Sequence, residues 1–123
     1  MVQVISATLQ PSLCATEESN SRQLRVGLYQ MKWYENTSEH LQQLRAGVAA
    51  CAHAGAQIVF LPELTLSRYP ADKRPESSSD RKPEEISNGP TVAFAKDAAR
   101  ENDVFVQVSL YEQVARDDGL GFN

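Results

Sequence analysis

The sequence lacks the features that define several large classes of protein. No apolar run approaches the roughly 18 residues that a membrane-spanning helix needs. The formal net charge is −4, which is the wrong sign for the basic patch that nucleic acid or an anionic membrane attracts, so we expect neither as a partner. The two cysteines, Cys14 and Cys51, have no metal-binding spacing and are too few for a disulfide framework. Residues 1–10 lack the basic and continuously apolar segments of a secretory signal, and together these absences predict a soluble, cytoplasmic protein.

The composition is that of an ordinary globular domain, with 41% apolar and 23% charged residues in a chain of 123. Residues 1–23 read as a weakly structured N-terminal lead, because Pro11 and the polar stretch after it interrupt any strand. Residues 24–123 form the organised part of the chain. Within it, the run from Asp72 to Glu85 is rich in Pro, Ser and charge and reads as a solvated loop.

The first half of the organised part has the pattern of a βαβ unit. Leu24 to Gln30 alternates as a strand does, and Asn36 followed by Glu39 has the form of a capping box at a helix start. The inward stripe of this helix is expected at Leu41, Leu44, Val48 and Cys51. Gly55 is a suitable helix stop, and the apolar run Ile58 to Leu61 then predicts a strand buried on both faces.

A second unit follows the loop. Asn88-Gly89-Pro90 predicts the start of a helix that ends near Asn102, and residues 104–111 predict a third strand. We expect the inward stripe of this helix at Val92, Ala95 and Ala99. Residues 117–119 indicate a turn, and residues 120–123 resemble the entry to a further strand. The predicted fold class is α/β with a βαβαβ order and an incomplete sheet, as in a chain that has been cut short.

The strongest candidate for chemistry is Glu63, in the segment Phe60 to Leu64 (FLPEL). A carboxylate here follows a buried strand, at the sheet edge where open α/β folds bind their ligands. Pro62 ends the strand pairing directly before it. Partial burial at this place would raise the pKa of a Glu towards neutrality, as a general base requires. Alternatively, Glu63 caps a turn or pairs with a surface arginine such as Arg68.

The segment Ile58 to Pro70 (IVFLPELTLSRYP) resembles the segment of the nitrilase superfamily, the carbon–nitrogen hydrolases, that carries the family's glutamate. Three flanking segments are similar to the family in the same order: Arg25 to Gln30, Asn88-Gly89-Pro90, and Val106 to Glu112. The resemblance implies that the chain is the N-terminal part of an αββα sandwich. It also implies hydrolysis at non-peptide C–N bonds of a small-molecule amide, nitrile or carbamoyl compound, with no metal and no organic cofactor. Arg68 departs from the family, which commonly has Gly there.

The family's catalytic triad is a Glu base, a Lys that stabilises the tetrahedral intermediate and a Cys nucleophile, so the resemblance assigns Glu63 as the base. No residue of this sequence is assigned to the other two roles, and we expect the 123 residues to be inactive alone. Tyr111 and Glu112 end the third predicted strand on the same side of the sheet as Glu63 if the strands are parallel, so they are candidate walls of the substrate pocket, although strand-end residues are more often simple caps. By the resemblance, Tyr69 is a further candidate wall, and its alternative role is that of a packing aromatic. Family members commonly associate, so a homo-oligomer is a further expectation for the full-length enzyme.

Other residues and other functions fit less well. Cys51 falls on a predicted inward stripe and is expected to be a buried structural thiol, while Lys96 is expected to be solvated in mid-helix. The main alternative function is a non-catalytic α/β module that binds a partner through exposed sheet edges. A flavodoxin-like ligand binder would need a Gly-rich phosphate loop after the first strand, which this sequence lacks.

Overall fold

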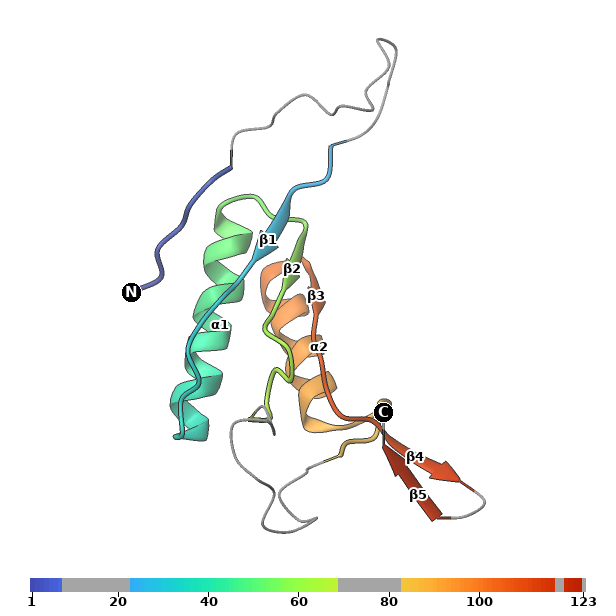
Figure 1. Cartoon of the computed structure of the whole chain (residues 1–123). Coiled ribbons are helices and arrows are strands. Elements are labelled where there is room, and N and C mark those ends of the chain that lie inside the picture. Colours follow the sequence, from blue (N-terminus) through green and yellow to red (C-terminus); the bar gives the residue numbers. More distant parts are fainter. Residues whose placement is uncertain (8–22, 69–82, 117–118, 123) are drawn as a thin grey trace.

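The computed structural model describes residues 1–7, 23–68, 83–116 and 119–122. Its main body alternates strands and helices along the chain: β1 (Val26–Leu28), α1 (Thr37–His53), β2 (Ile58–Phe60), α2 (Pro90–Asn102) and β3 (Phe105–Gln107). The three strands form one parallel sheet in the order β1-β2-β3, so β2 is central. Figure 1 shows both helices against the sheet. The predicted βαβαβ order and the incomplete parallel sheet are confirmed.

A β-hairpin follows this sheet. Strands β4 (Gln113–Arg116) and β5 (Gly119–Phe122) pair antiparallel, with Gln113 opposite Phe122, and the hairpin projects away from the helices in Figure 1. From the sequence, a turn at residues 117–119 and the entry to a further strand at residues 120–123 were expected, but β4 was not. It also extended the third strand from residue 104 to residue 111, whereas β3 spans only Phe105–Gln107.

Local chemistry sets the helix boundaries where the sequence predicted them. At the start of α1, the Asn36 Oδ1 accepts a hydrogen bond from the Glu39 N–H at 3.0 Å, which satisfies one of the free donors of the first turn. Gly55 ends this helix with a φ of +86°, a conformation that side chains with a Cβ rarely adopt. Pro90 occupies the first turn of α2, where its missing N–H costs nothing.

The core lies between the two helices and one face of the sheet. On that face the register aligns Gly27, Val59 and Val106, and Val59 is fully buried beneath the helices. The buried apolar cluster comprises Leu44, Val48, Ala56, Val59, Leu61, Phe94 and Ala98. One prediction about this layer was wrong. The helix α2 buries Thr91, Phe94 and Ala98, whereas the expected stripe of Val92, Ala95 and Ala99 is only half-buried.

The other face of the sheet has no covering layer among the described residues. Phe60 on the central strand is 37% exposed and Phe105 on β3 is 74% exposed, and Val26 and Leu28 of β1 lie on the same face. The expectation that β2 is buried on both faces is therefore wrong for this part of the chain, because both helices pack on one side. The described residues form one helical layer and one sheet layer.

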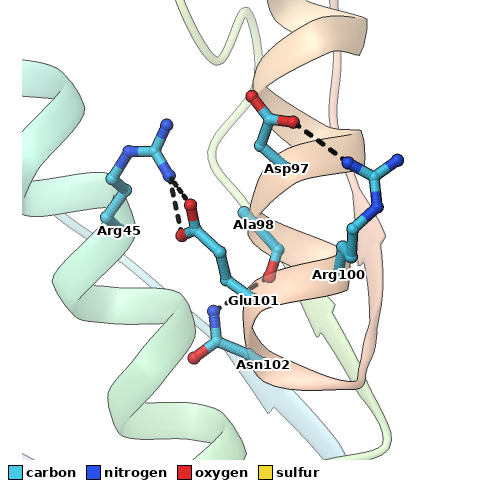
Figure 2. A network of polar contacts seen from close by, with 6 residues as sticks. All are labelled: Arg45, Asp97, Ala98, Arg100, Glu101 and Asn102. Carbon is cyan, nitrogen blue, oxygen red and sulfur yellow. Dashed lines mark hydrogen bonds and ion pairs between the residues drawn. The ribbon is translucent and has the colours of Figure 1, made fainter.

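A polar contact joins the two helices at their exposed side. The Arg45 guanidinium on α1 donates to both carboxylate oxygens of Glu101 on α2, at 2.9 and 2.7 Å (Figure 2). The Arg45 guanidinium also lies 5.6 Å from the centre of the Phe94 ring. Both charged side chains are about half exposed, so the pair adds little stability.

Candidate functional site

Glu63 lies in the loop that leaves the carboxyl end of β2, the central strand. The Leu61 N–H still donates to the Gln107 carbonyl at 3.2 Å, so the pairing with the third strand continues one residue beyond Phe60. Pro62 has no N–H and ends the pairing directly before Glu63. The carboxylate therefore follows the parallel sheet at the edge where open α/β folds bind ligands.

The Glu63 side chain is exposed, whereas the sequence analysis expected partial burial. Burial needs side chains packed over the loop, and the described neighbours hold the loop mainly through its backbone. Within the described ranges, no hydrogen bond or ion pair engages the Glu63 carboxylate. Arg68, which was considered as its surface partner, forms an ion pair with Glu35. Glu63 is thus exposed, and its carboxylate oxygens accept no hydrogen bond from the residues that the structure describes.

Thr65 fixes the loop to the segment that follows β3. Its N–H donates to the Ser109 carbonyl at 2.9 Å, and its hydroxyl oxygen accepts a hydrogen bond from the Ser109 N–H at 3.0 Å. The same hydroxyl donates to the Pro62 carbonyl at 3.1 Å. Thr65 is only 2% exposed, so these hydrogen bonds are shielded from water. The backbone on both sides of Glu63 is therefore held in place.

The residue after Glu63 has an unusual backbone conformation. Leu64 is buried and has a φ of +52°, in the left-handed region that a bulky residue occupies at a cost of about 1–2 kcal/mol. The Ser67 N–H donates to the Leu64 carbonyl at 2.9 Å and closes a turn over this residue. Strained residues of this kind gather at functional sites, where surrounding contacts maintain them. The backbone strain at Leu64 is a structural observation that adds to the sequence motif from which Glu63 was predicted.

Of the three candidate pocket residues, two lie in the described part of the chain. Tyr111 and Glu112 follow β3 at the same sheet edge as Glu63, because the strands are parallel. Their backbone pairs with Glu84, whose N–H donates to the Tyr111 carbonyl at 2.7 Å. Both side chains are half-buried, and the described residues show no hydrogen bond from either to Glu63. Their role in a pocket stays a prediction, and Tyr69 lies outside the described residues.

Glu84 is a buried carboxylate that the sequence analysis missed, because it fell in the run read as a solvated loop. It is 8% exposed and accepts hydrogen bonds from the Thr91 N–H at 2.8 Å and the Thr91 hydroxyl at 2.7 Å. It thereby caps α2, whose N-cap residue, Gly89, has no side chain to do so. A Cβ at Gly89 would lie 2.8 Å from Glu84 atoms, so the glycine permits this approach. The signal in the sequence was a Gly-Pro helix start preceded by a nearby carboxylate.

The structure gives no catalytic surroundings to Cys51 or Lys96 among the residues that it describes. Cys51 packs against the core, and burial raises the pKa of its thiol, which disfavours the reactive thiolate. The Lys96 ammonium is exposed and donates to the Ser87 carbonyl at 3.2 Å. Cys14 lies outside the described residues. Across the described ranges, no three His, Cys, Asp or Glu side chains gather to hold a metal ion, and neither helix is long and apolar enough to span a membrane.

Together these observations define an α/β protein with an uncommitted carboxylate on a fixed loop at the carboxyl edge of a parallel sheet. A search of curated proteins found no match to the sequence. The family model for carbon–nitrogen hydrolases matches residues 25–123. The chain therefore belongs to the carbon–nitrogen hydrolase family, as the Glu63 segment and its flanks predicted.

Proposed function

We propose that this chain supplies the general-base segment of a carbon–nitrogen hydrolase, with Glu63 as the base. The observation that supports the proposal is the exposed Glu63 carboxylate, which has no partner among the described residues and sits on a loop fixed by Thr65. The substrate is a small-molecule amide, nitrile or carbamoyl compound. The enzyme is cytoplasmic, uses no cofactor and forms homo-oligomers at full length.

The proposed chemistry assigns Glu63 one task, the removal of a proton. In the family mechanism the base takes the proton of a cysteine thiol as the thiolate attacks the substrate carbon, and a lysine stabilises the tetrahedral intermediate. An exposed carboxylate on a rigid loop suits this task, because it can approach a thiol without first breaking an interaction of its own. Tyr111 and Glu112 would stand at the side of the substrate.

The 123 residues are proposed to be inactive alone, since no residue of the sequence is assigned as the lysine or the nucleophile. The purified chain, assayed with simple amides, nitriles and N-carbamoyl compounds, should show no turnover. Turnover that disappears in Glu63→Gln would refute this inactivity and would require a nucleophile within the chain.

The role of Glu63 itself is tested in a chimera, in which residues 25–123 replace the matching segment of an active carbon–nitrogen hydrolase. We expect Glu63→Gln to lower kcat about 10²- to 10⁴-fold, the usual contribution of a general base. The variant should keep the Tm of the unsubstituted chimera, because the side chain is exposed. Glu85→Gln is the matched control, since Glu85 is also exposed, and it should leave kcat unchanged. Equal activity of the Glu63→Gln and Glu85→Gln chimeras would remove Glu63 from the mechanism.

The alternative function, a non-catalytic binding module, is favoured by the apolar outer face of the sheet. Leu28 is 78% exposed and Phe105 is 74% exposed there, which is unusual for apolar side chains of a sheet. In the αββα sandwich that the family resemblance implies, a second sheet would cover this face. A chimera that folds but stays inactive with Glu63 intact would favour the binding module over the hydrolase.

A further inference from the structure

His40 lies in the first turn of α1 and reaches the loop that carries Glu63. Its Nε2 is 2.8 Å from the carbonyl oxygen of Thr65, and the side chain is 6% exposed. A carbonyl oxygen only accepts hydrogen bonds, so this contact assigns a ring proton to Nε2. Asn36 caps the helix and its carbonyl accepts a hydrogen bond from the His40 N–H at 2.9 Å, which fixes where His40 falls on the helix.

Trp33 packs against the His40 ring. The two ring centroids are 4.2 Å apart with an interplanar angle of 45°. In the described part of the chain, the indole N–H of Trp33 and the Nδ1 of His40 are both buried without a hydrogen-bond partner. Buried polar atoms are rarely left unpaired in folded proteins, because the loss of water costs free energy that no new bond offsets.

The His40 hydrogen bond completes the fixation of the loop. The Thr65 N–H and hydroxyl hold the loop to Ser109, and the Thr65 carbonyl is the one remaining backbone group of this buried residue. Without a donor from α1, that carbonyl would be buried and unsatisfied, at a cost comparable to a lost hydrogen bond. His40 thus ties the first helix to the residue two positions after Glu63.

We propose that His40 is a positioning residue for Glu63: its Nε2–H holds the Thr65 carbonyl, and the Trp33 ring shields that hydrogen bond from water. The position of the carboxylate then depends on α1 as well as on β3. The expected effect of His40 on catalysis rests on the proposed function of Glu63, whereas its expected effect on the position of the loop does not.

Hydrogen exchange in the full 123-residue chain tests the effect on the loop directly. His40→Leu removes the donor, and we expect the amides of Leu61, Thr65 and Ser67 to exchange about tenfold faster or more, the effect of losing a buried hydrogen bond. The amides of Val59 and Ala98 should keep their protection. His40→Gln retains an N–H donor and should restore most of the loop protection.

Three results would overturn the proposal. His40→Leu could leave the loop amides unchanged, or it could lower protection equally throughout the chain, which would indicate only general stability. His40→Gln could match His40→Leu, which would exclude the hydrogen bond as the cause. Should His40→Leu fail to fold, Trp33→Ala and Trp33→Phe carry the test, because only Trp33→Ala should expose the hydrogen bond and speed loop exchange.

The same chimera that tests the proposed function separates the two claims. If Glu63 is the base, His40→Leu should lower kcat at least about tenfold and His40→Gln should recover most of it. If Glu63→Gln has no effect on kcat while loop exchange responds to His40 as expected, the positioning stands and the base assignment fails. If Glu63→Gln abolishes activity while His40→Leu changes neither exchange nor kcat, the positioning fails and the base assignment stands.

Discussion

Gly47 on α1 is predicted to reject even a single added methyl group. A Cβ built at this position would lie 2.4 to 2.5 Å from three ring atoms of Tyr29, which follows β1. Carbon atoms at van der Waals contact are separated by about 3.5–4.0 Å, so the Tyr29 ring would have to move as a whole. Gly47 thereby lets the tyrosine pack across α1, close to the carboxyl end of the sheet.

Two opposing terms decide the effect of Gly47→Ala on stability. Alanine is favoured over glycine inside a helix by about 1 kcal/mol, which would stabilise the protein if the site were open. Overpacking a close contact costs about 1–3 kcal/mol. Because three ring atoms are involved and Gly47 is buried, we expect the packing cost to win and the free energy of unfolding to fall by about 1 kcal/mol.

Urea denaturation, followed by circular dichroism, measures this difference, and a second background isolates its cause. In Tyr29→Ala the ring is absent, so Gly47→Ala should there stabilise the protein by about 1 kcal/mol. Ala46→Gly, at the exposed neighbouring position, calibrates the helix propensity and should destabilise by a similar amount. A stabilising Gly47→Ala in the presence of Tyr29 would refute the packing of this ring against the helix.

Two further predictions concern buried groups. Burial raises the pKa of the Cys51 thiol, so in a Cys14→Ser background alkylation of the folded chain should require a higher pH than alkylation of the urea-unfolded chain. The Cys51 thiol contributes to the free energy of unfolding at lower pH, and this contribution should be lost as the pH rises through the raised pKa. If the folded chain were alkylated at the same low pH as the unfolded chain, the raised pKa would be contradicted. Glu84→Gln replaces the charged carboxylate, which accepts from the Thr91 N–H and hydroxyl, with a neutral amide that has a single oxygen, and it should lower the free energy of unfolding by about 1–3 kcal/mol in urea denaturation. Glu85→Gln is the matched control, and an equal effect of both substitutions would refute the capping role of Glu84.

Elements that depend on neighbouring residues were predictable from the sequence. The Asn36 cap, the Gly55 stop and the Pro90 start act within a few residues, so the two helices begin and end where the pattern indicated. The parallel pairing of the strands follows from the alternation of strands and helices, because consecutive parallel strands need a helical crossover. The position of Glu63 after the second strand follows from the same local signals, whereas the central place of that strand was not predicted.

Burial and pairing were less predictable, because they depend on residues far apart in the chain. The sequence predicted a partly buried Glu63 and a solvated Glu84, and the structure shows an exposed Glu63 and a buried Glu84. The inward side of α2 was also predicted wrongly, since Val92 and Phe94 are equally apolar and only the arrangement of α1 and the sheet decides which is covered.

The sequence by itself determined the family, the order of the elements and the glutamate at the carboxyl end of the second strand. Tertiary structure decided what holds that glutamate in place. The contact between His40 and Thr65 joins residues 25 positions apart, and the bonds between Thr65 and Ser109 join residues 44 positions apart. Periodicity reports which face of an element is apolar, but it carries no information about which distant backbone group that face will meet.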